Sequence, residues 1–223
     1  MPYDLAPLGL SLKLATVTTI VLILIGIPLA YWLAFSRTRA RPFLEALVSM
    51  PLVLPPTVLG FYILVFLSPG HALGAFLERI LDVRVVFSFT GLVIGSVIFS
   101  LPFMVNPIKA GFQNFPCALI EAAYTLGKSR RQTLVSVIIP NTKSSLLTGI
   151  VMSFAHTMGE FGVVLMIGGG IPHHTRVASI AIYNEVEVMN YSAANFYSMI
   201  LVVFSMAVLA LFYALYRRHG EVV

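Results

Sequence analysis

The chain has 223 residues, of which 58% are hydrophobic and only 10% are charged, and its mean hydropathy is +0.93. Soluble domains carry about 25% charged residues, so the composition excludes an ordinary soluble enzyme or binding domain. The net charge of +5 is divided among separate short segments without interleaved aromatic residues, which argues against a nucleic-acid partner. The sequence therefore predicts an all-α integral membrane protein with a single transmembrane domain over residues 1–223.

Long apolar runs predict five membrane-spanning helices, because a helix needs about 20 apolar residues to cross a bilayer. The predicted spans cover residues 12–35, 47–67, 85–108, 145–167 and 196–216. A basic cluster follows the first span instead of preceding it, so this span is not expected to be a cleaved signal peptide. Of the 14 Lys and Arg residues, ten fall on the side of residues 110–143 and four on the other. The positive-inside rule then places the N-terminus outside and the C-terminus inside.

Prolines and glycines interrupt the spans. Pro51, Pro55 and Pro56 open the second span, and each removes a backbone donor. Two interpretations stay open: ordinary kinked packing, or a bundle shaped around a transport path. Residues 168–172 predict a flexible end to the fourth span, and residues 175–190 a mildly amphipathic outer segment.

A polar, basic segment lies between the third and fourth spans, over residues 110–143. It predicts a helix from about Cys117 with Glu121 in its early turns, interrupted at Gly127 and limited by Pro140. The basic residues toward the far end complement the helix dipole; they are Lys128, Arg130 and Arg131. The prediction is a helix-turn-helix element at the inner membrane surface. The alternative is a solvated loop that basic residues hold against lipid headgroups.

Residues 122–129 resemble a phosphate-binding loop, G-x-x-x-x-G-K-[ST], but the first glycine is missing and no strand precedes them. The chain is therefore not expected to be an enzyme, and no nucleotide or metal cofactor is expected in it. Cys117 is the only cysteine, so cysteine spacing supports neither an intramolecular disulfide nor a metal site.

The same segment resembles the EAA motif of bacterial ABC importer permeases, which reads E-A-A, three residues, G, nine residues and I-x-L-P. Here Val137 and Ile139 stand at the two aliphatic positions. In that family the loop forms the coupling helix, which docks into a cleft of the cytoplasmic ATPase subunit. The resemblance implies a cytoplasmic coupling loop over residues 110–143 with these ATPase-coupling residues: Glu121, Ala122, Ala123, Leu126, Gly127, Lys128, Arg130, Arg131 and Pro140.

Four further segments resemble the molybdate/tungstate-type permeases: residues 51–60, 101–105, 122–127 and the G-E-F-G of residues 159–162. His156 is a departure, since members of that family carry arginine there. The resemblance implies a type I ABC importer permease fold and ATP-driven import of molybdate or tungstate by alternating access. Another oxyanion such as sulfate is the alternative, because the sulfate-type permeases are closely related to the molybdate/tungstate type.

The resemblance also implies partners and a location. They are a second copy of this permease, two cytoplasmic ATPase subunits that bind ATP and Mg, a periplasmic or lipid-anchored oxyanion-binding protein, and membrane lipid. The expected location is the cytoplasmic (inner) membrane of a bacterium or archaeon, with several spans.

Glu160 is an acidic residue inside a predicted span, with His156 four residues earlier on the same helix face. One interpretation is a structural hydrogen bond that locks two spans. A second places His156, Gly159, Glu160, Phe161 and Gly162 at the pathway or its gate. A metal pair would have too few ligands. A proton-coupled secondary transporter is an alternative from another class, although the chain shows no convincing internal repeat.

Overall fold

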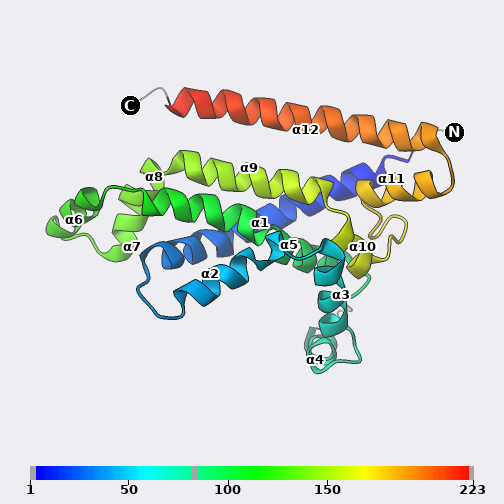
Figure 1. Ribbon diagram of the computed structural model, residues 1–223, viewed down its shortest axis with the longest axis horizontal. Helices are drawn as coiled ribbons and strands as arrows, with labels where there is room; N and C mark the ends of the chain where they lie inside the picture. The colour runs from blue at the N-terminus through cyan, green and yellow to red at the C-terminus, as the bar shows by residue number, and fades with distance from the viewer. Residues whose placement is uncertain (1–3, 82–84, 221–223) are drawn as a thin grey trace.

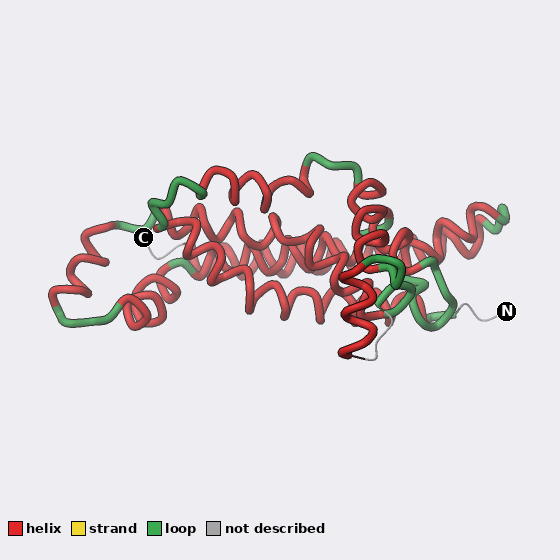
Figure 2. The backbone as a smooth tube through the Cα atoms, turned by 90° about the horizontal axis from the view of Figure 1, so that it is seen from below, coloured by secondary structure: helices red, strands yellow, loops and turns green. Residues whose placement is uncertain are grey.

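The computed structural model describes residues 4–81 and 85–220, and within these ranges the regular elements are all helical (Figures 1 and 2). The predicted all-α class is confirmed. In chain order the elements are α1 (Ala6–Phe35), α2 (Arg41–Ser49), the 3-10 helix η1 (Met50–Leu52), α3 (Pro56–Leu67), α4 (Ala72–Leu81), α5 (Phe89–Gln113), α6 (Cys117–Thr125), α7 (Arg130–Thr133), the π-helix η2 (Leu134–Ile138), α8 (Ile139–Asn141), α9 (Lys143–Gly159), α10 (Gly162–Gly168), α11 (Ala178–Glu187) and α12 (Tyr191–Gly220).

The core of the bundle consists of α1, α5 and α9, which lie side by side along its length (Figure 1). The first two run in the same direction, since Leu14 packs with Leu92 near one end and Gly26 lies against Met104 farther along. In contrast, α9 runs the other way, because Thr157 pairs with Ser100 while Gly149 lies against Ile108. Gly26 and Gly149 are small where neighbouring helices come closest, as is common in membrane bundles.

Three described helices are long and apolar enough to cross a membrane: α1, α5 and the Tyr191–Ala214 part of α12. Two bent pairs bring the number to five if each pair is one span. One pair joins residues 41–52 to α3 at 110°, and the other joins residues 130–141 to α9 at 78°. The predicted span over residues 47–67 is therefore not one continuous helix, and the predicted span over residues 145–167 is divided at Glu160, between α9 and α10.

Local chemistry explains both breaks. Pro55 has an extended backbone because Pro56 follows it, and Pro56 then opens α3 at a position where its missing N–H costs nothing. In the fourth predicted span, α9 ends at Gly159, Glu160 is extended, and α10 begins at Gly162. Gly169 and Gly170, both with positive φ, end α10, where the sequence predicts the end of the fourth span.

The N-terminal segment is tied to the far end of the chain by polar contacts that the sequence alone did not indicate. Arg176 pairs with Asp4 at 3.4 Å, and the Tyr197 hydroxyl donates to the Asp4 carbonyl at 2.8 Å. The backbone N–H of Ala178 donates to Ser11 Oγ at 2.8 Å. These bonds hold the start of α1 against α11 and α12, at the end of the bundle opposite α6 and α7 (Figure 1).

The last helix, α12, packs on α9 and α11 and leaves most of its surface uncovered. Only 6% of its most apolar 18-residue window is buried. This apolar surface is available to lipid or to another subunit.

Candidate coupling segment and transport pathway

The helix predicted from Cys117 is α6, and Gly127 ends it. The backbone N–H of Gly127 donates to the Tyr124 carbonyl at 2.9 Å, and that of Lys128 to the Ala123 carbonyl at 3.0 Å. This pair of bonds is a Schellman motif. It requires a left-handed residue, and Gly127 has φ +79°. A side chain at this position would be strained, although a Cβ would meet no heavy atom within 4 Å.

A second helical stretch, from Arg130 to Asn141, follows the turn. Ser129 caps it, since its hydroxyl accepts from the Gln132 N–H at 3.3 Å while the Gln132 side chain accepts from the Ser129 N–H at 2.9 Å. Arg130 and Arg131 therefore open α7 and do not close α6. The predicted dipole arrangement, with basic residues at the far end of the first helix, is wrong because Gly127 ends that helix first.

Pro140 limits the regular α-helix before it, as predicted, and the helical stretch ends at Asn141, one residue after it. The residues before it form the π-helix η2, and Pro140 lies in the single turn of α8. A proline removes one bond and its ring crowds the carbonyl four residues earlier. The wider π-turn accommodates both effects. The predicted helix-turn-helix arrangement is thus present, with a longer second part.

The turn between α6 and α7 projects beyond the rest of the bundle (Figure 2). Leu126, at this turn, is 80% exposed. Most of the predicted coupling residues are exposed or half-buried, whereas Ala123 is buried and anchors α6. An apolar side chain at an exposed tip beside basic residues is typical of a surface that another protein covers.

A groove of about 680 Å³ adjoins this tip, between the turn and η2. Lys128 crosses it, and its Nζ donates to Ser136 Oγ at 2.8 Å. The residues that line the groove are Leu126, Gly127, Lys128, Arg131, Gln132, Val135 and Ser136. Leu126 and Val135 are its exposed apolar side chains, so the groove and the tip form one continuous surface.

In the core, His156 connects α9 to α5. Its Nδ1 lies 2.9 Å from Ser100 Oγ, and its ring stacks on Phe103 with the centroids 4.0 Å apart. Phe99 approaches the same ring at 4.7 Å. Ser100 also pairs with Thr157 at 2.9 Å. His156 is thus held by one hydroxyl and two aromatic rings, all from α5.

Glu160 lies at the break between α9 and α10 and is only 4% exposed. Ser96 lies beside its carboxyl, yet neither carboxylate oxygen has a hydrogen-bond partner among the described residues. A buried charge without a partner is costly within a membrane. The predicted pairing of Glu160 with His156 is absent from the described contacts, because the helix ends at Gly159 and the two residues no longer share a helix face.

Gly159 is exposed, and a Cβ there would meet no heavy atom within 4 Å, but the residues after it are tightly packed. A Cβ on Gly162 would lie 2.8 Å from the Cβ of Pro56, so the start of α10 touches the start of α3. Phe161 packs against Tyr183 of α11 with ring centroids 5.1 Å apart, and Ser179 Oγ donates to the Glu160 carbonyl at 2.6 Å. The predicted residues around Gly159–Gly162 therefore lie where α3, α9, α10 and α11 meet.

Sequence reasoning missed Ser96, Ser100 and Thr157, all of which are buried. Ser96 and Ser100 lie four residues apart within an apolar span, which puts them on one helix face. That spacing was an available signal. No group of three or more His, Cys, Asp or Glu side chains in the described part of the chain could hold a metal ion.

In the middle of α2, Glu45 bridges two cations. Arg41 Nε lies 3.0 Å and Lys109 Nζ 3.4 Å from the same carboxylate oxygen. The hydrogen bond from Arg41 holds the pKa of the Glu45 carboxyl below its usual value. These contacts join α2 to α5 beside the polar segment.

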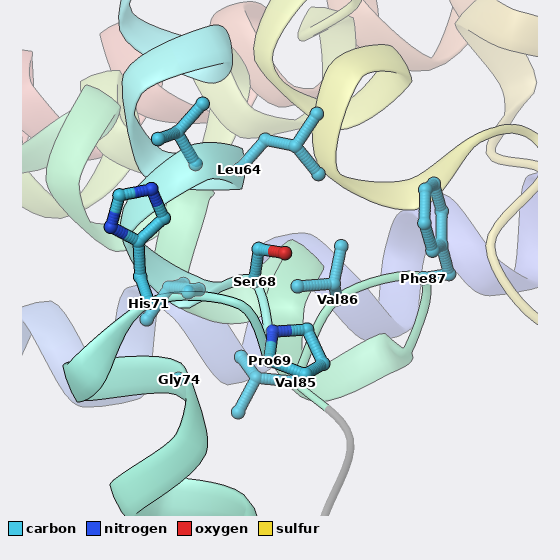
Figure 3. A pocket seen from close by; sticks show the side chains of 10 residues that line it. Leu64, Ser68, Pro69, His71, Gly74, Val85, Val86 and Phe87 are labelled. Carbon is cyan, nitrogen blue, oxygen red and sulfur yellow. The ribbon is translucent and has the colours of Figure 1, made fainter.

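A separate pocket of about 620 Å³ lies between the end of α3, the turn into α4 and the segment that enters α5. Figure 3 shows His71 and Phe87 on opposite sides of it, with Ser68 between them. Its lining is largely apolar. It contains none of the predicted site residues, so the structure does not connect it with the coupling segment or with the break at Glu160.

Comparison with known proteins shows the family of the chain. The family described as binding-protein-dependent transport system inner membrane component matches residues 26–220. The chain belongs to this family. It is the permease subunit of an ABC importer, a protein that crosses the cytoplasmic membrane several times.

Several relatives are named for molybdenum transport. The molybdenum transport system permease protein ModB of Azotobacter vinelandii is 42% identical over 212 residues, 95% of this chain and 94% of the relative. The putative molybdenum transport system permease protein YvgM of Bacillus subtilis is 34% identical, over 91% and 89% of the two chains. The sulfate transport system permease protein CysT of Escherichia coli is 29% identical, over 99% and 79%.

Solved structures share the fold at low identity. The MetNI methionine ABC transporter in an inward-facing conformation matches with a TM-score of 0.74 and 16% identity, over 95% of this chain and 94% of that one. A bacterial alginate ABC transporter matches with a TM-score of 0.79 and 17% identity, over 98% and 80%. The fold is therefore that of type I ABC importer permeases.

Proposed function

We propose that this permease carries molybdate, or the closely similar tungstate, into the cytoplasm. The observation that supports this substrate most strongly is the 42% identity to a molybdenum permease over 95% of the chain. The identity to a sulfate permease is lower, at 29%. Sulfate is the alternative substrate.

The proposed topology has five spans, with the N-terminus outside and the C-terminus inside. Two arguments support it. The start of α1 and the end of α12 lie at opposite ends of the bundle (Figure 1), as an odd number of crossings requires. The end that carries the turn between α6 and α7 also carries most of the basic residues, which the positive-inside rule assigns to the cytoplasm.

The segment from Glu121 to Pro140 is the proposed ATPase-coupling element. Its projecting tip, the exposed Leu126 and the adjoining groove offer a helix and a turn that fit a cleft of a partner. Two ATPase subunits, which bind ATP and Mg, would act on two copies of this permease. The uncovered apolar surface of α12 is compatible with contacts to a second copy or to lipid.

An external energy source is needed because of the substrate's charge. Moving two negative charges inward against 100 mV costs about 4.6 kcal/mol. An ATPase partner and a binding protein that delivers the oxyanion meet this requirement. The permease itself needs only weak contacts with the oxyanion, since a tight site would slow release.

The residues His156, Gly159, Glu160, Phe161 and Gly162 are the proposed pathway or gate. Their place at a helix break where four helices meet supports this role, because such breaks in membranes occur beside cavities or within protein. A carboxylate is a poor ligand for an oxyanion, so Glu160 is assigned to the gate and not to the substrate.

Uptake by the assembled transporter tests the substrate. The permease, its ATPase and its binding protein are reconstituted in proteoliposomes with ATP inside, and uptake of molybdate, tungstate and sulfate is measured separately. Saturable uptake of molybdate or tungstate in preference to sulfate is expected. Preferential uptake of sulfate would support the alternative, that this permease carries sulfate. Uptake that survives ATP depletion but collapses with an uncoupler would support a proton-coupled transporter instead.

A further inference from the structure

A second groove, of about 720 Å³, lies at the same end of the bundle, between the end of α1 and α6. It shares no residue with the groove beside the coupling tip. Its size is within the range of small-molecule sites. The side chains that line it come from α1, α6 and the stretch after Ser129, and they are Tyr31, Trp32, Phe35, Ser36, Arg37, Cys117, Ile120, Glu121, Tyr124, Arg130 and Ile138.

The charges in this groove have both signs. Arg37 and Arg130 contribute two guanidinium groups, and Glu121 contributes one carboxylate. None of the three forms an ion pair with another described residue. A guanidinium recognises phosphate through several parallel hydrogen bonds, and a carboxylate accepts hydrogen bonds from a primary ammonium. The groove thus offers complementary groups to a zwitterion that carries both.

The surroundings point to a lipid as the source of that zwitterion. Trp32 and Tyr31 lie in the last turns of a membrane-spanning helix, where such rings meet the headgroup region. The groove is continuous with an exposed apolar strip on α1, formed by Leu24, Ile25, Trp32 and Phe35. These residues lie on one side of the helix, so an acyl chain could extend along them while the headgroup occupies the groove.

We propose that this groove binds a phospholipid whose headgroup contains a phosphate and a primary ammonium, with the phosphate on Arg37 and Arg130 and the ammonium on Glu121. The leaflet follows from the proposed topology, which makes it the inner one. The proposal does not depend on which oxyanion is carried. It assigns to Glu121 a lipid contact in addition to its place in the proposed coupling segment.

Lipid binding to the full-length permease tests the proposal. The purified, delipidated protein is titrated with phosphatidylethanolamine, phosphatidylcholine and phosphatidylglycerol of identical acyl chains, and bound lipid is counted by native mass spectrometry. Saturable binding of phosphatidylethanolamine is expected, about fivefold tighter than phosphatidylcholine, whose ammonium has no N–H to donate. Phosphatidylglycerol supplies the phosphate without the ammonium, so its affinity is expected to be lower than that of phosphatidylethanolamine.

Variants separate the two halves of the headgroup. Glu121→Gln is expected to bring phosphatidylethanolamine to the affinity of phosphatidylcholine. Arg37→Gln is expected to weaken all three lipids about fivefold, as the loss of one cation near a membrane surface does. Arg39→Gln is the matched control, since Arg39 is exposed, two residues away and outside the groove. Circular dichroism and gel filtration establish that each variant is folded.

Several results would overturn the proposal. An unchanged preference for phosphatidylethanolamine in Glu121→Gln would show that Glu121 does not bind the ammonium. Equal losses in Arg37→Gln and Arg39→Gln would show diffuse attraction to the membrane instead of a site. Loss of the bound lipid when the ATPase assembles on the permease would assign the groove to the ATPase. None of these measurements uses oxyanion uptake as its readout, so a failure here is distinguishable from a failure of the proposed function.

Discussion

The projecting turn between α6 and α7 and the buried break at Glu160 are both predicted functional regions, yet they are built in opposite ways. The turn is held by local bonds, between residues no more than eight apart, as in the Schellman motif at Gly127 and the cap at Ser129. The break is held by residues far apart in the chain, such as Ser100 with His156 and Gly162 against Pro56. A turn held by local bonds keeps its shape when a partner protein binds or leaves. A junction packed from several helices instead transmits movement from one helix to another.

The largest effect is expected from Gly127→Val, which tests the local character of the turn. A β-branched residue with positive φ costs roughly 1–3 kcal/mol, so the turn should rearrange although no atom obstructs the side chain. We expect the protein to insert in the membrane, while ATPase co-purification and uptake fall about tenfold or more. Uptake in proteoliposomes and pull-down of the ATPase measure both.

Gly127→Asn is the matched variant, because asparagine adopts the left-handed conformation more readily than valine does. It is expected to restore much of the lost uptake. Normal ATPase co-purification and uptake in Gly127→Val would rule out this turn as the coupling element.

Glu160→Gln tests whether the buried break takes part in gating. The amide has the same shape and no charge, so the folded protein should tolerate it, and the unfolding temperature should stay within a few degrees of the parent. If the carboxyl changes its surroundings during transport, uptake falls about tenfold. Unchanged uptake in a stably folded Glu160→Gln protein would make this residue structural only.

Ser100→Ala tests the contact that joins α5 to α9. The change removes the Ser100 hydroxyl from both His156 Nδ1 and the Thr157 hydroxyl, each 2.9 Å away, and should cost roughly 1 kcal/mol of stability. Thermal unfolding in detergent measures the loss. Ser153→Ala is the control, since Ser153 is equally buried and its hydroxyl has no hydrogen-bond partner among the described residues. Equal losses in the two variants would show that the contacts of Ser100 with α9 have no specific role.

The smallest effect concerns Glu45. Its pKa is lowered in the folded protein by Arg41, so the contact stabilises the fold at neutral pH, and this stabilisation disappears as the pH falls through the lowered pKa. Glu45→Gln should therefore reduce stability at pH 7 by less than about 1 kcal/mol, and the difference from the parent should vanish in acid. A difference that persists unchanged at low pH would point to lost packing instead of lost charge.

Much of the coupling segment was predictable because its signals are local. The end of α6 follows from Gly127, and the polar composition of residues 110–143 already separates them from the apolar spans. The predicted place of the basic residues, at the far end of the helix that begins near Cys117, was wrong for a related reason. Gly127 ends this helix before Arg130 and Arg131, although a longer helix would have given them a favourable interaction with its dipole.

The sequence by itself determined the helical class, the membrane environment and the place of the polar segment, because composition and local backbone chemistry decide these. Only the tertiary structure decided that His156 contacts Ser100 and not Glu160, and that α3 turns by 110° from the stretch before it. It also showed that the end of α1 meets α6 in a charged groove. These features depend on which distant helices pack together, and packing follows from the shapes of whole faces, which no local pattern specifies.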